Sequence, residues 1–309
     1  MSTADTLDEL AFATSGSTGA PISWLRTRDQ VDAETRLLAR LCASGGIDGV
    51  VTYAPREHLY GYLMGVALPE HLRVPVRTTD LLSSPADALT GLHRPLIAAL
   101  PATFAHLARS HPALTALDRL VLVHSSAALP SGAAAVLAAL PVETRFVELF
   151  GSTETGLIAT RDDPAGTTWQ LAPDVTFTDP ADGTPGPLSV RSPRLARQSG
   201  HARPRHWRTG DVVAVTGPRT FRWLGRRGEI VKVNGRRIEL DDVLARLAPA
   251  APGTRLTARA HRDPLRGEWF TVVAHTADPA VLAAVRDHSR ALPAGLRPRA
   301  VEAFTEETP

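Results

Sequence analysis

The sequence predicts an α/β protein with a mostly parallel sheet and helices, then a small antiparallel, barrel-like region, then a small C-terminal α+β lobe. Strand and helix patterns alternate over the first half of the chain, which is typical of a parallel sheet. After Gly156, proline and glycine become frequent and only short strand patterns follow. A mixed pattern begins at Gly225. We therefore expect a large domain over residues 1–224 and a smaller lobe over residues 225–309.

The elements of the first half follow from hydrophobic periodicity. Strands are expected where β-branched residues and leucines run together, and helices where apolar residues recur every three or four positions. The expected strands are residues 9–14, 49–53, 117–124 and 145–149, and the expected helices are residues 27–43, 60–68, 101–110 and 131–140. Residues 94–100 fit a strand or the start of a helix, because so short an apolar run has no decisive period.

The second half is expected to contain shorter elements. Strand patterns at residues 186–191, 211–215 and 221–224 predict the antiparallel region. In the lobe, strands are expected at residues 230–233, 237–240, 255–261, 269–275 and 301–304, and helices at residues 241–247 and 280–292.

The composition excludes several classes of protein. A chain of 309 residues suits one large domain with a smaller one. Hydrophobic residues make up 43% and charged residues 21%, an ordinary globular balance that excludes a wholly disordered chain. No apolar run reaches the roughly 18 residues of a membrane span, and the first residues lack the basic-then-apolar pattern of a secretion signal. We therefore expect a cytoplasmic protein without a membrane segment.

Two residue types that occur once narrow the chemistry further. Cys42 is the one cysteine, which excludes an internal disulfide and a cysteine-based metal site. Lys232 is the one lysine, and arginine does not replace a compact ammonium that must reach a reacting carboxylate. Any mechanism that needs a lysine must therefore use Lys232. The net charge of +2, with scattered basic residues, does not indicate a nucleic-acid partner.

Residues 14–21 (TSGSTGAP) lie between an expected strand and an expected helix. Two glycines permit a tight turn, and the hydroxyls and backbone amides can surround an anion. A helix after the turn would place a phosphate near the helix N-terminus. Taken alone, the segment fits an ordinary polar loop equally well.

Three further segments carry polar groups with a chemical use, although each alone also fits a plain turn. Residues 150–156 (FGSTETG) follow an expected strand, and a carboxylate such as Glu154 beside hydroxyls is a common way to hold magnesium and phosphate. Residues 207–211 (WRTGD) end in Asp211, which could accept hydrogen bonds from both hydroxyls of a ribose. Residues 225–240 (GRRGEIVKVNGRRIEL) contain Lys232.

Together and in this order, the four segments resemble the AMP-forming acyl-adenylating superfamily, which includes acyl- and aryl-CoA synthetases, nonribosomal-peptide adenylation domains and luciferases. They are similar to its TSGSTG-x-P, aromatic-Gly-x-Thr-Glu, R-T-G-D and G-R-x-D-x-x-K-x-x-G-x-R-I-E motifs. Residues 54–61 (APREHLYG) and 125–130 (SSAALP) resemble, more weakly, its Pro-x-x-His-x-x-Gly and Gly-Gly-Ala-x-Leu segments. The resemblance spans essentially the whole chain.

The resemblance implies ATP and Mg²⁺ as cofactors and a C-terminal lobe that moves. The implied nucleotide-binding residues are Thr14, Ser15, Gly16, Ser17, Thr18, Gly19, Ser126, Ala127, Phe150, Gly151, Asp211 and Arg226. The implied catalytic residues are Lys232, Glu154, Thr153 and His58, and Glu154 is also the implied magnesium ligand. The residues that would border the acyl pocket are His58, Ser125, Gly151 and Leu157. Taken singly, His58 and Phe150 also fit packing residues.

Three features depart from the family's pattern. Only 13 residues precede Thr14 where the family has a long subdomain, so we expect an apolar face that a second copy or a partner subunit covers. Ile22 follows Pro21 where the family usually has a lysine. The C-terminal lysine that bridges acyl carboxylate and α-phosphate in the family has no match, and Lys232 matches a position that faces the site in the thioester-forming pose. We therefore expect slow adenylation or recruitment of Lys232.

The leading hypothesis is ATP-dependent activation of a small carboxylic acid to an acyl-adenylate, with transfer to CoA or to the phosphopantetheine thiol of an acyl carrier protein. One alternative is an acyltransferase that uses a pre-activated adenylate or thioester without its own adenylation step. Another is a degenerate, non-catalytic adenylate- or acyl-binding partner subunit. A serine hydrolase or a zinc peptidase is not supported, because Gly-x-Ser-x-Gly and His-Glu-x-x-His are absent.

Overall fold

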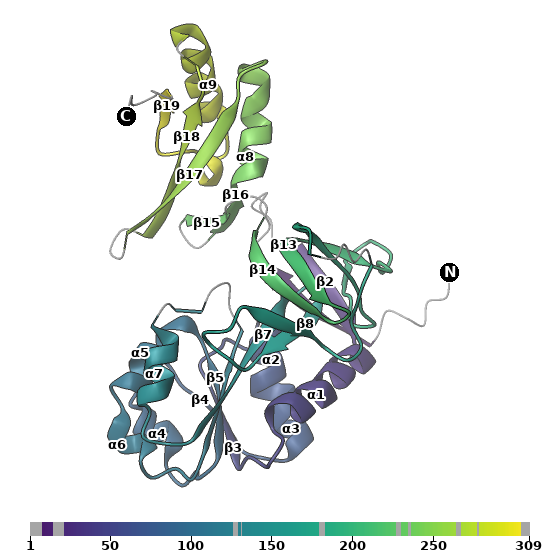
Figure 1. The fold of residues 1–309 in the computed structure, drawn as a ribbon, viewed down its shortest axis with the longest axis vertical. Coiled ribbons are helices and arrows are strands. Elements are labelled where there is room, and N and C mark those ends of the chain that lie inside the picture. Colours follow the sequence, from purple (N-terminus) through teal and green to yellow (C-terminus); the bar gives the residue numbers. More distant parts are fainter. Residues whose placement is uncertain are drawn as a thin grey trace. The chain divides into compact units, whose positions relative to one another are not determined.

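The computed structural model describes residues 8–14, 22–125, 129–130, 132–178, 183–226, 230–233, 236–263, 267–276 and 278–303. They form two compact units, one made of residues 8–14 and 23–224 and the other of Ile22 and the residues from 225 onward (Figure 1). No helix in these ranges is long and apolar enough to cross a membrane.

In the described part of the large unit, the central sheet has 11 strands in the order β10-β11-β13-β14-β9-β8-β7-β6-β5-β3-β4. Its parallel strands are β3 (Gly49–Thr52), β4 (Val76–Thr78), β5 (Pro95–Ala99), β6 (Leu120–His124) and β7 (Thr144–Ser152). The strands that continue it beyond β7 are β8 (Gly156–Arg161), β9 (Thr168–Leu171), β10 (Thr176–Phe177), β11 (Gly186–Arg191), β13 (Trp207–Gly217) and β14 (Thr220–Arg226). The predicted α/β fold is confirmed, and the antiparallel region extends the same sheet.

Helices cover both faces of the parallel strands (Figure 1). The helices are α1 (Arg28–Cys42), α2 (Leu59–Tyr62), the π-helical turn η1 (Leu63–Ala67), α3 (Leu68–Leu72), α4 (Pro85–Leu89), α5 (Pro101–Ala108), α6 (His111–Leu114) and α7 (Ala133–Ala139). Alternate residues of one strand enter different cores: Val121 joins the core under α1 to α3, and Leu122 joins the core with Phe104 and Leu107 of α5. Burial on both faces explains the continuous apolar runs of β3, β5 and β6.

A second sheet, of order β1-β2-β12, lies beside the central one and contains β1 (Glu9–Thr14), β2 (Ile22–Thr27) and β12 (Arg197–Gln198). The helix predicted at residues 27–43 is present as α1, and an unpredicted strand, β2, precedes it. Trp24 and Leu25 of β2 pair with β12, which holds this segment extended. Helix α1 begins only after Thr27, whose hydroxyl accepts a hydrogen bond from the Gln30 amide in a capping box.

The second unit has a small core of its own. Its elements are β15 (Ile230–Val233), β16 (Arg236–Glu239), α8 (Leu240–Leu247), η2 (Ala248–Ala250), β17 (Leu256–Asp263), β18 (Gly267–Ala274), α9 (Pro279–Ala291), η3 (Ala294–Leu296) and β19 (Val301–Ala303). Strand β18 pairs antiparallel with β17 and parallel with β19. Val231, Val243, Phe270 and Val285 form the centre of its core. The described elements follow the strand and helix pattern predicted for this part of the chain.

Candidate functional site

The predicted site residues Thr153 and Glu154 lie on a tight turn between β7 and β8. The Ser152 amide donates to the Thr155 hydroxyl at 3.1 Å, and that hydroxyl donates to the Gly156 carbonyl at 2.9 Å. Gly156 has a φ of +67°, which favours glycine. A Cβ on Gly151 would lie 2.1 Å from the Gly156 carbonyl oxygen, so the start of the turn also requires a glycine. The turn leaves both Thr153 and Glu154 half-buried.

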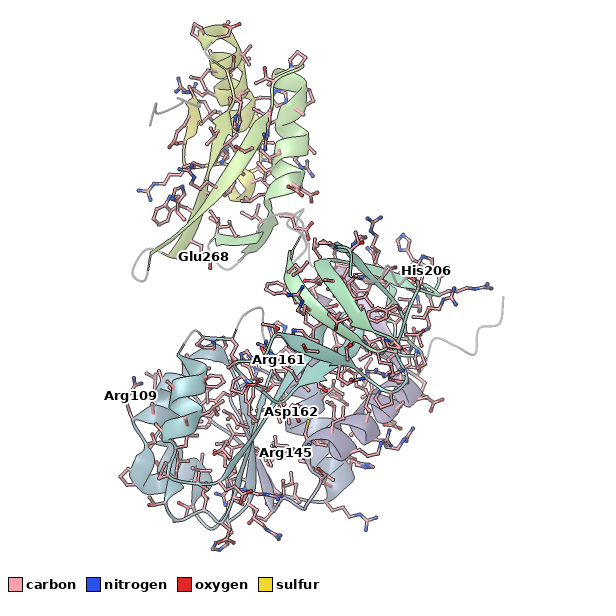
Figure 2. All side chains as sticks on the ribbon, in the orientation of Figure 1. Arg109, Arg145, Arg161, Asp162, His206 and Glu268 are labelled. Carbon is pink, nitrogen blue, oxygen red and sulfur yellow. The ribbon has the colours of Figure 1, made fainter. Side chains whose placement is uncertain are left out.

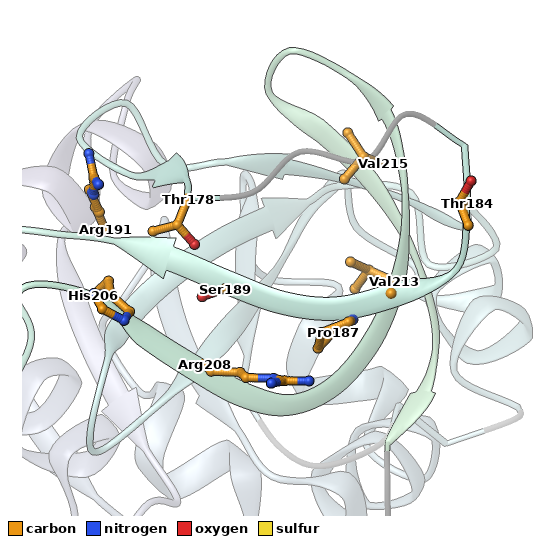
Figure 3. Close-up of a pocket in the computed structure, with 10 residues that line it drawn as sticks. Thr178, Thr184, Pro187, Ser189, Arg191, His206, Arg208, Val213 and Val215 are labelled. Carbon is orange, nitrogen blue, oxygen red and sulfur yellow. The ribbon is translucent and has the colours of Figure 1, made fainter.

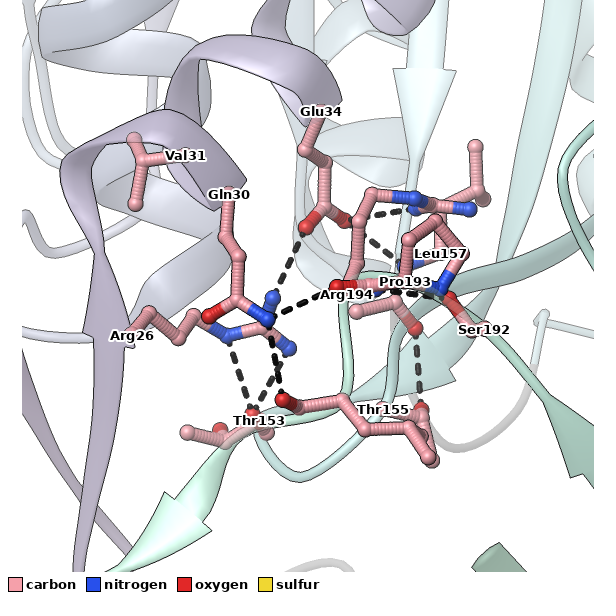
Figure 4. A network of polar contacts seen from close by, with 12 residues as sticks. Arg26, Gln30, Val31, Glu34, Thr153, Thr155, Leu157, Ser192, Pro193 and Arg194 are labelled. Carbon is pink, nitrogen blue, oxygen red and sulfur yellow. Dashed lines mark hydrogen bonds and ion pairs between the residues drawn. The ribbon is translucent and has the colours of Figure 1, made fainter. Parts of the chain in front are cut away.

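A network of buried ions holds this turn by its backbone (Figure 4). Arg26 of β2 donates from Nε and Nη2 to the Thr153 carbonyl oxygen, at 3.3 and 3.0 Å. Its Nη1 lies 3.1 Å from Oε2 of Glu34, a residue of α1. Oε1 of Glu34 accepts a hydrogen bond of 2.7 Å from the Leu157 amide. Both ends of the turn are therefore fixed by one buried ion pair.

A second buried arginine completes the network. Arg194 Nη1 lies 3.5 Å from Glu34 Oε1, and Nε and Nη2 form a fork with Asp174 at 2.9 and 2.7 Å. Arg26 and Arg194 are 0% exposed and Glu34 is 2% exposed. Burial lowers the pKa of Arg26, and the Glu34 carboxylate partly opposes that shift. Because a buried cation needs a partner, the arginines and Glu34 are stable only together.

Thr14, the first residue of the predicted phosphate loop, ends β1 with its hydroxyl already engaged. It accepts a hydrogen bond of 3.1 Å from the indole Nε1 of Trp24, whose ring packs edge-on against Trp207. Glu9 at the other end of β1 pairs with Arg197 and Arg203. The strands that flank the loop are thus anchored. The predicted phosphate residues Ser15, Gly16, Ser17, Thr18 and Gly19 lie outside the described residues.

Two other predicted nucleotide-binding residues lie on strands beyond the turn. Asp211 Oδ1 accepts a hydrogen bond of 3.0 Å from Trp223 Nε1, and its amide donates to the Thr209 hydroxyl at 3.1 Å. The ring of Phe150 packs edge-on against Trp169 and Phe221, at centroid distances of 5.1 and 5.6 Å. Phe150 is nevertheless only half-buried, so part of its surface remains accessible.

Two of the predicted acyl-pocket residues, Ser125 and Gly151, lie at the carboxyl ends of parallel strands, where ligands bind in open α/β sheets. Ser125 follows β6 and is half-buried, Gly151 lies near the end of β7, and Leu157 is buried in β8. His58 is exposed, and its side chain makes no capping hydrogen bond to α2. The remaining predicted residues are outside the described set: Ser126, Ala127 and the side chains of Arg226 and Lys232.

Tyr60, close to His58 in the chain, belongs to the packing of the sheet. Its hydroxyl donates to the Val123 carbonyl at 2.8 Å, and burial raises its pKa well above the ordinary value. A Cβ on Gly61 would lie 2.0 Å from the Pro55 carbonyl oxygen. The glycine of this segment is therefore needed for close backbone packing.

Sequence reasoning missed a second chain of buried polar groups, across β6, β7 and β8. His124 Nδ1 lies 3.5 Å from Glu148 Oε1, and Arg161 Nε lies 2.5 Å from Glu148 Oε2 (Arg161 is labelled in Figure 2). His124 is completely buried, and its ring nitrogens have no hydrogen-bond partner among the described residues. A histidine and a glutamate inside apolar strands were the signal that could have found this chain.

Two further features of the described residues bear on the site. The described ranges contain no group of three or more His, Cys, Asp or Glu side chains that could hold a metal. A groove of about 570 Å³ lies on β10, β11 and β13 (Figure 3). Arg191, His206 and Arg208 line it, and no residue predicted to bind nucleotide or acyl group does.

Comparison with known proteins identifies the family. No family model matches the chain. It is 32% identical over 270 residues to an isonitrile lipopeptide synthase of Streptomyces coeruleorubidus, covering 76% of this chain and 18% of that protein. It is 29% identical over 288 residues to a 4-coumarate–CoA ligase of Halorhodospira halophila, covering 88% of this chain and 66% of that protein. The chain thus spans under two thirds of the length of either relative.

Solved structures point the same way. A malonyl-CoA ligase in a ternary product complex with methylmalonyl-CoA and AMP has a TM-score of 0.63 and 25% identity, covering 97% of this chain and 71% of that one. The chain belongs to the AMP-forming acyl-adenylating superfamily. An amide bond synthetase of Marinactinospora thermotolerans, with a TM-score of 0.61 and 23% identity over 95% of this chain and 65% of that one, shares the fold. The predicted superfamily is confirmed, and Arg26 and Glu34 are the supports of its Thr-Glu motif in this chain.

Proposed function

We propose that this adenylating-superfamily chain activates a small carboxylic acid with ATP to an acyl-adenylate and transfers the acyl group to a thiol of CoA or of an acyl carrier protein. The observation that carries the proposal is the turn between β7 and β8. Its backbone is fixed by Arg26 and Glu34, while the Thr153 hydroxyl and the Glu154 carboxylate have no hydrogen-bond partner within the described ranges. A binding site needs polar groups that are held in a fixed position by their surroundings, and the Thr153 hydroxyl and the Glu154 carboxylate meet that need.

Magnesium fits the donor set of this turn. Mg²⁺ in nucleotide sites usually takes one or two carboxylates, with phosphate oxygens and water as the other ligands. A single carboxylate at Glu154 therefore suffices, and a cluster of three acids is not required. Bound there, Mg²⁺ would neutralise the charge that develops on the phosphate under attack. In this proposal the Thr153 hydroxyl donates to an oxygen of the α-phosphate.

The nucleotide would extend from this turn along the edge of the sheet. Phe150 offers a half-buried aromatic surface for the adenine, and Asp211 offers a carboxylate for the ribose hydroxyls. Oδ1 of Asp211 accepts a hydrogen bond from Trp223 Nε1, which fixes the orientation of the carboxylate. Ser15 to Gly19, Ser126, Ala127 and Arg226 complete the proposed nucleotide site, and His58, Ser125, Gly151 and Leu157 the acyl pocket.

Lys232, the one lysine in these 309 residues, takes part in adenylation or thiol transfer in this proposal. We propose the large unit as the binding domain and the second unit as a mobile lobe, in a cytoplasmic protein that pairs with a second copy or a partner. Large hydrophobic side chains exposed in the described ranges are few: Val76, Leu81, Leu82, Trp223 and Leu224.

Exchange of pyrophosphate into ATP, measured with a panel of carboxylic acids and Mg²⁺, tests this proposal. We expect exchange with at least one acid, and a loss of about 100-fold or more in Glu154→Gln, because charge on the phosphate is then less well neutralised. Asp162→Asn, which changes an exposed carboxylate just after β8, is the matched control and retains exchange (Figure 2).

Each other outcome identifies an alternative. Turnover of a synthetic acyl-adenylate without exchange from any free acid would indicate transfer alone. ATP binding by calorimetry, with neither exchange nor transfer, would indicate a binding subunit. Full exchange in Glu154→Gln would refute the role of the turn.

A further inference from the structure

Arg26 stands out because it is fully buried and each of its three side-chain nitrogens has a hydrogen-bond partner. Nε and Nη2 meet the Thr153 carbonyl oxygen, Nη1 meets Glu34, and the side chain is 0% exposed. Resting on the function proposed above, we infer that Arg26 is a positioning residue that sets the affinity for Mg-ATP through its hydrogen bonds to the Thr153 carbonyl. Glu34 holds the other end of the turn, because it accepts a hydrogen bond from the Leu157 amide. We call Arg26 and Glu34 together the clamp.

The contacts form a closed ring. From Arg26 it runs to the Thr153 carbonyl, along the backbone to the Leu157 amide, to Glu34 at 2.7 Å and back to Arg26 at 3.1 Å (Figure 4). Glu34 also fills the space beside Gly156, where a Cβ would lie 2.5 Å from Oε2. The backbone of residues 153–157 is part of this ring, and the Glu154 carbonyl accepts a further hydrogen bond of 2.8 Å from the Ala196 amide. Movement of the turn therefore requires breaking buried, charge-assisted hydrogen bonds.

The clamp also links parts of the large unit that are distant in the sequence. Arg26 lies on β2, directly after residues 14–21, and reaches a turn 127 residues later in the chain. Glu34 lies on α1, the helix that follows β2. Strand β2 and helix α1 are thus both tied to the Thr153–Glu154 turn by this pair of side chains. Outer residues that orient a binding group commonly change affinity by about 10- to 100-fold when removed.

An arginine is required because of the shape of its guanidinium. Two of its N–H groups point to one carbonyl while a third meets a carboxylate, a fork that a lysine ammonium cannot reproduce. Arg26→Lys keeps a positive charge beside Glu34 but loses part of the hydrogen bonding to the Thr153 carbonyl. Arg26→Met gives up both and leaves Glu34 beside Arg194 alone.

The test compares Arg26→Lys, Arg26→Met and the double variant Arg26→Met with Glu34→Gln, which removes both charges and guards against misfolding. Arg145→Met is the control: Arg145 donates to the Leu41 carbonyl at 2.7 Å from the opposite end of β7. The measurements are KM and kcat for Mg-ATP in exchange, Kd for Mg-ATP by calorimetry, and hydrogen exchange of the amides of residues 153–157.

We expect KM and Kd for Mg-ATP to rise by about 10- to 100-fold in Arg26→Met, with a smaller change in kcat, and to recover partly in Arg26→Lys. The Leu157 amide should exchange faster in Arg26→Met and the double variant, and as in the wild type in Arg145→Met. Folded variants with unchanged Kd and unchanged amide exchange would overturn the inference, as would an equal loss in Arg145→Met. If the wild type shows no exchange with any acid, the proposed function fails, while Kd and amide exchange still decide on the clamp.

Discussion

Two buried polar pairs differ in how fully their groups are bonded: Arg26 of β2 with Glu34 of α1, and His124 of β6 with Glu148 of β7. Every nitrogen of Arg26 and both oxygens of Glu34 have a partner, and the partners include the backbone of a turn. His124, beside Glu148, has no hydrogen bond to either ring nitrogen within the described ranges. From this difference we infer that a buried charged group fixes the backbone around it only when all of its hydrogen bonds are made.

The largest effect should come from breaking the fully bonded pair. Glu34→Ala leaves Arg26 and Arg194 buried without their shared carboxylate and the Leu157 amide without an acceptor, so we expect a loss of about 3–5 kcal/mol in the free energy of unfolding. Urea unfolding followed by circular dichroism measures it. Asp287→Ala, which removes an exposed ion pair with Arg290, should leave the urea midpoint unchanged. Equal shifts in both variants would remove the distinction.

The second effect separates backbone strain from contact with the clamp. Gly156→Ala forces an alanine into φ +67° and places its Cβ 2.5 Å from Glu34 Oε2, so we expect a loss of about 1–3 kcal/mol. Gly200→Ala is the matched control, because Gly200 has a φ of +80° and open space around it. The excess loss in Gly156→Ala, measured by urea unfolding, reports the contact with Glu34. A loss no greater than that of Gly200→Ala would show that the glycine serves backbone conformation alone.

The sequence predicts the strand and turn that carry Thr153 and Glu154, but it does not predict the residues that hold this turn in place. Residues 150–156 were expected at a strand end, and they lie there because β7 has a clear apolar pattern. The partners Arg26 and Thr153 are 127 residues apart, a pairing that no local pattern encodes. Strand β2 was missed because a short segment of mixed polarity has no period, and it forms through pairing with β12. Glu34 had one signal in the sequence, because it lies in the apolar stripe of α1 with Val31 and Leu38.

The smallest effect should come from the incompletely bonded pair. His124→Leu removes an imidazole that makes no hydrogen bond among the described residues, and Glu148 keeps its contact with Arg161 at 2.5 Å. Replacing a poorly satisfied buried polar group with an apolar one is nearly neutral, so we expect a change within about 1 kcal/mol of the wild type in urea unfolding. Glu148→Leu, by contrast, leaves the Arg161 guanidinium without its carboxylate and should cost more. If His124→Leu were as damaging as Glu34→Ala, the completeness of bonding would not govern what these buried ions contribute, and the imidazole would have to make contacts beyond the described ranges.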